Sequence, residues 1–66
     1  MTKEQYGERM NELATQFNNF MKLLCWRSAS HRIRQMAKVQ SEYMGETYDE
    51  RLAHLIKVFD FKQMTT

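Results

Sequence analysis

A chain of 66 residues with a net charge of +2 and one cysteine is long enough for one small domain, but too short for a large core. The single cysteine excludes an internal disulfide, and no apolar run approaches the roughly 20 residues of a membrane span. From its length, we expect the chain to form a single domain over residues 1–66. Because no hydrophobic run follows a basic N-terminus and only one cysteine is present, we expect this domain to be located in the reducing cytoplasm, without membrane contact.

The composition predicts an all-α fold, because proline is absent, glycine occurs only at Gly7 and Gly45, and strong helix formers are abundant. A first helix is predicted over about residues 3–26, since Thr2 and Gln5 have the spacing of a capping box. Its apolar side chains recur every three or four residues and form one face: Tyr6, Met10, Leu13, Phe17, Phe20 and Leu24.

The apolar pattern then changes sides. A new stripe appears about 200° around the helix axis from the first and consists of Trp26, Ile33, Met36, Ala37, Tyr43 and Met44. One continuous helix would need different partners above and below Trp26. A turn over residues 27–30, with Ser28 or Ser30 as a helix cap, explains the change more simply. We therefore favour a helical hairpin whose second helix covers about residues 29–44.

A third helix is predicted after a clear stop. Gly45 can adopt the left-handed conformation that ends many helices. Thr47 and Glu50 then match a second capping box, which predicts a helix over about residues 48–60. Its apolar stripe consists of Leu52, Leu55, Ile56 and Phe59. Residues 62–66 are expected to form a frayed tail.

The lengths of the two predicted hairpin helices differ. At 1.5 Å per residue, the first helix spans about 37 Å and the second about 22 Å. Tyr6 and Met10 would therefore extend beyond the second helix and stay uncovered, while Leu24 would face Ile33. Because a second copy can cover such an overhang, we expect a C2 homodimer. A monomeric three-helix bundle is the alternative.

The side chains available for binding favour a protein partner. Six methionines and eight aromatic residues are a large supply for this length, and such side chains anchor protein interfaces as well as fill cores. We expect a small non-enzymatic regulator that binds and inhibits a larger protein, of the kind found among phage and plasmid accessory factors. The residues expected to contact this partner are Tyr6, Met10, Trp26, Arg27, Arg32 and Arg34.

The uneven distribution of charge supports an alternative function. No acidic residue lies between Glu12 and Glu42, whereas five cations lie there. A nucleic-acid-binding regulator would contact phosphates through Arg27, His31, Arg32, Arg34 and Lys38. A solvated helix face explains the same charges more simply, and no known nucleic-acid motif is present.

Catalytic and metal-binding patterns are incomplete. Cys25 and His31 are six residues apart, so they face different directions on a helix, and no third group orients them. Glu50 and His54, with Asp49 nearby, form only part of a metal site. We expect no catalytic residue, metal, cofactor or small-molecule substrate.

Overall fold

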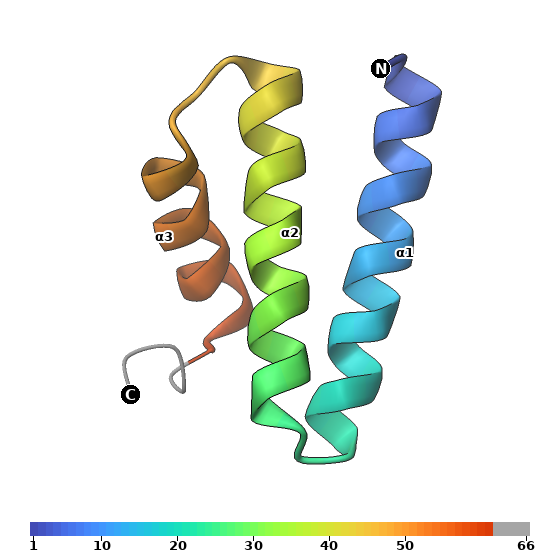
Figure 1. The fold of residues 1–66 in the computed structure, drawn as a ribbon, viewed down its shortest axis with the longest axis vertical. Coiled ribbons are helices and arrows are strands. Elements are labelled where there is room, and N and C mark those ends of the chain that lie inside the picture. The colour runs from blue at the N-terminus through green and yellow to red at the C-terminus, as the bar shows by residue number, and fades with distance from the viewer. Residues whose placement is uncertain (62–66) are drawn as a thin grey trace.

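The computed structural model describes residues 1–61, which contain three α-helices: α1 (Lys3–Lys22), α2 (Trp26–Met44) and α3 (Tyr48–Phe59). The predicted all-α fold is confirmed. Figure 1 shows α2 between α1 and α3, with the α1–α2 turn at one end of the molecule and the α2–α3 connection at the other. The tail predicted for residues 62–66 lies outside the described residues.

Local signals in the sequence define three of the helix ends. The Thr2 hydroxyl accepts a hydrogen bond from the Gln5 backbone N–H, and the Gln5 side chain accepts one from the Thr2 N–H, which confirms the first capping box. The Thr47 hydroxyl accepts from the Glu50 N–H at the start of α3. Gly45 has a φ of 73° and ends α2, as predicted.

The predicted position of the first turn is wrong. The turn lies at Leu23–Cys25, whereas residues 27–30 belong to α2. Ser28 and Ser30 are therefore helical, and Cys25 takes the N-cap position, where its side chain forms no capping hydrogen bond to α2. The serines do not act as caps because the chain has already reversed three residues before Ser28.

Backbone geometry closes this turn without glycine or proline. Leu24 has a φ of 58°, in the left-handed region that glycine usually occupies. The Leu24 N–H donates to the Met21 carbonyl and the Cys25 N–H to the Phe20 carbonyl, at 3.1 and 2.9 Å. These two bonds define a Schellman motif, which satisfies carbonyls that the end of a helix otherwise leaves free.

The core lies along one stripe of α2, which packs against both other helices. α1 contributes two buried side chains, α2 four and α3 one, and one more lies beyond α3. The full set is Leu13, Phe17, Ala29, Ile33, Met36, Ala37, Leu55 and Phe61. Trp26, Tyr43 and Met44, predicted to lie on the apolar stripe of the second helix, are instead exposed. The buried stripe is shorter than predicted, because it runs from Ala29 to Gln40 and these three side chains lie beyond its ends.

Gln40 is the one polar side chain buried among the described residues. Its Oε1 accepts a hydrogen bond from Nε of Arg51 on α3, at 3.1 Å. Nη1 of Arg51 also lies 3.0 Å from a carboxylate oxygen of Glu46 in the α2–α3 connection. Since a buried amide without a partner is costly, this network fixes how α3 sits on α2.

Phe61 belongs to the core although it follows the predicted third helix. Asp60 has a φ of 54°, and the N–H groups of Asp60 and Phe61 donate to the Lys57 and Ile56 carbonyls. This second Schellman motif turns the chain back, so the Phe61 ring lies against Phe17 of α1 at a centroid distance of 5.3 Å. The contact joins α1 to the end of α3.

The earlier turn also removes the predicted overhang. α1 has 20 residues and α2 has 19, so the two helices have nearly equal lengths. The Tyr6 ring stacks on the Tyr43 ring with centroids 4.1 Å apart, and Met10 packs against the core. Leu24, predicted to face Ile33, is exposed in the turn instead. The reason for expecting a dimer is therefore absent.

The C2 homodimer itself stays a prediction. Light scattering at micromolar concentration measures it directly, because the chain has a mass of 8.0 kDa and a dimer has twice that mass. A single-chain mass across the concentration range would contradict the prediction.

Replacing Phe61→Ala is expected to lower the free energy of unfolding by about 3–5 kcal/mol, because the fully buried ring leaves a cavity beside Phe17. Urea unfolding followed by circular dichroism measures the change. Val58→Ala is the matched control, since Val58 is exposed on α3 and its truncation is expected to change stability by less than about 0.5 kcal/mol. Equal effects of the two changes would show that Phe61 is not a core residue.

Candidate functional site

Three apolar side chains are exposed together at the α1–α2 turn, and we call them the turn surface: Leu23, Leu24 and Trp26. The exposed fractions are 69% for Leu23, 68% for Leu24 and 37% for Trp26. Cys25, between them, is also exposed. Figure 1 shows that this turn forms one end of the molecule, away from the chain N-terminus. A small domain thus leaves two leucines and part of its one tryptophan in water.

The exposure of Leu24 follows from its backbone. At the C′ position of a Schellman motif the chain leaves the helix, so a side chain there points away from the packed face of α1. The left-handed conformation costs a non-glycine residue roughly 1–2 kcal/mol. Leu24 therefore buries little apolar surface on folding, and its backbone conformation is unfavourable.

A second surface runs along the outward face of α2. Successive spacings of four, three and four residues place its members in one row, opposite the buried stripe. All of them are exposed, and we call them the basic stripe: Arg27, His31, Arg34 and Lys38. The row is about 16 Å long at 1.5 Å per residue. Glu42 follows at the next position and ends it.

Arg32 does not belong to this row, although it was predicted among the binding residues. It is half-buried on the side of α2 that faces α1, with its guanidinium carbon 5.6 Å from the centre of the Phe20 ring. Its Nη1 donates to Oε1 of Gln35 at 3.0 Å, while its Nε is buried without a hydrogen-bond partner in the described structure. The charge of Arg32 therefore helps α2 pack on α1.

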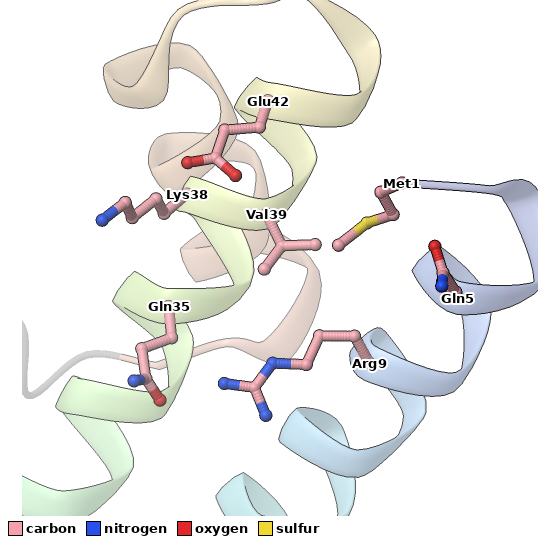
Figure 2. A pocket seen from close by; sticks show the side chains of 7 residues that line it. All are labelled: Met1, Gln5, Arg9, Gln35, Lys38, Val39 and Glu42. Atoms are coloured by element: carbon pink, nitrogen blue, oxygen red, sulfur yellow. The ribbon is translucent and has the colours of Figure 1, made fainter.

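A groove between α1 and α2 borders the basic stripe and has a volume of about 580 Å³. Figure 2 shows its lining: Met1, Gln5, Arg9, Gln35, Lys38, Val39 and Glu42. The side-chain oxygens of both Gln5 and Gln35 already accept intrachain hydrogen bonds, so their NH2 groups are the donors that they offer. Arg9 forms an ion pair with Glu12. The groove is therefore rich in donors but only partly cationic.

The structure separates the residues predicted to contact a protein partner. Trp26 and Arg27 lie at the turn, and Arg34 lies two helical turns further along α2. Tyr6 and Met10 are half-buried at the opposite half of α1, where Tyr6 is occupied by its contact with Tyr43. Of this predicted set, Trp26 belongs to the turn surface and Arg27 adjoins it.

Chemistry at other positions is limited. Within residues 1–61, no three His, Cys, Asp or Glu side chains are grouped so that they can hold a metal ion. Cys25 is at the turn, whereas His31 is on the outward face of α2. None of the helices in the described part of the chain combines the length and the apolar character needed to cross a bilayer.

Comparison with known proteins found no family model, no curated protein and no solved structure that matches this chain.

Sequence reasoning missed Leu23 and Leu24 as candidate site residues. Leu24 continues the apolar spacing of α1, so the pattern assigns it to the interior. The available signal was the basic residue Arg27 at the next position of the same face, which shows that the buried side ends there. Nothing in the residue types places the turn before Arg27 rather than after it.

Leu24→Gly is expected to raise the free energy of unfolding by about 0.5–1 kcal/mol, because glycine adopts the left-handed conformation without steric cost and little buried surface is lost. Gly45→Leu tests the same reasoning in reverse. Gly45 has a φ of 73° and open space around it, so backbone strain is expected to lower stability by a similar amount. Urea unfolding measures both. A loss of stability in Leu24→Gly would mean that the leucine side chain stabilises the fold.

Proposed function

We propose that this chain is a non-enzymatic regulatory module that binds a larger protein through the turn surface. The observation that supports this proposal is the exposure of Leu23, Leu24 and Trp26 at one end of the fold, while residues 1–61 bury eight apolar side chains in the core. Tryptophan is among the residues that contribute most to binding energy in protein interfaces. Its position beside two leucines provides an apolar anchor.

The energetics of Leu24 favour a role outside folding. Glycine at this position would suit the backbone better, and the leucine side chain is two-thirds exposed. Residues in unfavourable backbone conformations are concentrated at binding and active sites. Full burial of a leucine side chain by a partner is worth about 1.5–3 kcal/mol, which exceeds the gain in folding that glycine would bring.

The charges around the turn surface indicate what kind of partner site fits it. Lys22 precedes the turn and Arg27 follows Trp26, and both are exposed. The complementary site is an apolar pocket with acidic residues at its rim, since opposite charges orient an encounter and like charges oppose it. Binding to such a pocket would change the activity of the larger protein without catalysing a reaction. Inhibition, in which the chain blocks the pocket, is the simplest such effect.

The test uses a tagged chain to capture proteins from a lysate of the cells in which the gene is expressed. Wild type, Leu24→Gly and the control Val58→Ala are compared by quantitative mass spectrometry. We expect a protein that wild type and Val58→Ala retain and Leu24→Gly loses. Titration of that purified protein is expected to give at least about a tenfold weaker affinity for Leu24→Gly, equivalent to about 1.4 kcal/mol.

Stability separates this result from misfolding, because Leu24→Gly is expected to be at least as stable as wild type. Recovery of the same proteins in the same amounts by all three variants would contradict the proposal.

A further inference from the structure

We infer that the basic stripe on α2, which adjoins the turn surface at Arg27, is a second binding site that holds the phosphodiester backbone of a nucleic acid. Three basic side chains, Arg27, Arg34 and Lys38, lie in one row with His31 between them. All four side chains are exposed on the outward face of a central helix.

The composition of this face determines the class of partner. No carboxylate is present in the sequence between Glu12 and Glu42, so no acidic residue of α2 lies between Arg27 and Lys38. The apolar residues of α2 from Ala29 to Ala37 are buried on the other side of the helix. The stripe therefore offers charge and hydrogen-bond donors without an apolar anchor.

A surface of this kind suits a polyanion better than a protein or a membrane. Stable protein interfaces need buried aromatic or aliphatic anchors, and attachment to a bilayer by insertion needs an apolar face. A nucleic acid needs neither, because cations that replace its condensed counterions gain free energy from their release. The length of the stripe, about 16 Å, allows contact with several successive phosphates.

The structure also changes which residues belong to this site. Arg32 was predicted to contact phosphates, but its guanidinium packs over Phe20 and donates to Gln35. Replacing Arg32 would disturb the α1–α2 contact, so it is unsuitable as a test of binding. Gln35 lies beside the stripe, and its NH2 group provides a further donor for an anion at that edge.

The experiment measures fluorescence anisotropy of a labelled single strand of about 16 nucleotides and of a duplex of equal length, with full-length protein, from about 50 to 200 mM salt. Arg27→Gln/Arg34→Gln is compared with Lys3→Gln/Lys57→Gln. Lys3 and Lys57 are exposed on α1 and α3, outside the stripe. Each double variant lowers the net charge from +2 by two, to zero, so only the position of the lost charges differs.

For wild type, three phosphate contacts predict a slope of log affinity against log salt of about −2 on the single strand. Arg27→Gln/Arg34→Gln is expected to bind about tenfold more weakly at the lowest salt, and the slope is expected to become shallower by about 1.4. The control pair is expected to change both quantities much less. Circular dichroism checks that both variants remain helical.

Three results would overturn the inference: no binding of either oligonucleotide at the lowest salt, equal losses in the two double variants, or an affinity that does not change with salt. Vesicles of equal parts phosphatidylcholine and phosphatidylglycerol distinguish the source of the phosphate. Binding to vesicles without binding to oligonucleotides is a case of the first of these results, and it would overturn the inference by showing that the stripe binds lipid headgroups. Leu24→Gly is expected to bind oligonucleotides like wild type, so failure of the proposed protein-binding function leaves this result unaffected.

Discussion

The packing of two helices on one narrow stripe of α2 determines the rest of this structure. Ala29 and Ala37 lie on that stripe, and their small side chains allow the neighbouring helices to approach closely. The larger side chains Ile33 and Met36 fill the space between them, and a chain of this size has few others to bury. Because one side of α2 takes most of the available apolar volume, its other side is left to charged residues. The large apolar side chains that stay exposed in the described part of the chain lie at the N-terminus, at the α1–α2 turn, at the end of α2 and on α3.

Chain reversal explains which parts of the fold the sequence could predict. Gly45 marks its own left-handed conformation, so the end of α2 was predictable from residue type. Leu24 and Asp60 adopt the same left-handed conformation although neither is glycine, so residue type did not indicate the turn after α1 or the reversal of the chain after α3. The first turn lies closer to the N-terminus than predicted, so α1 is shorter and α2 is longer than predicted where the two helices join. The predicted overhang of α1 is therefore absent. The left-handed conformation of Leu24, which residue type did not indicate, thus explains why the predicted turn position and the predicted pairing of α1 with α2 were wrong. The argument for a dimer depended on that pairing.

The same limit applies to the candidate sites. The basic character of residues 27–38 could be predicted from composition, because charge does not depend on where a helix begins. Which of those cations are exposed could not be predicted. Arg34 is exposed while Arg32 packs over Phe20, and this difference depends on the position of α1. Leu24 continues the apolar pattern of α1, and only its place beyond the last turn of α1 exposes it. Periodicity identifies a helix face but not the residue at which that face stops being covered.

The two surfaces differ in what they cost the fold. The basic stripe lies on a helix face that would be solvated in any case, so its charges are retained with little effect on stability. The turn surface keeps apolar area in water and holds Leu24 in a left-handed conformation, both of which oppose folding. A feature that weakens a small domain needs a compensating benefit, whereas a solvated charge does not. The turn surface is therefore the stronger indication of function. The two surfaces meet at Arg27, so a change there alters both, while Leu24 and Arg34 each belong to one.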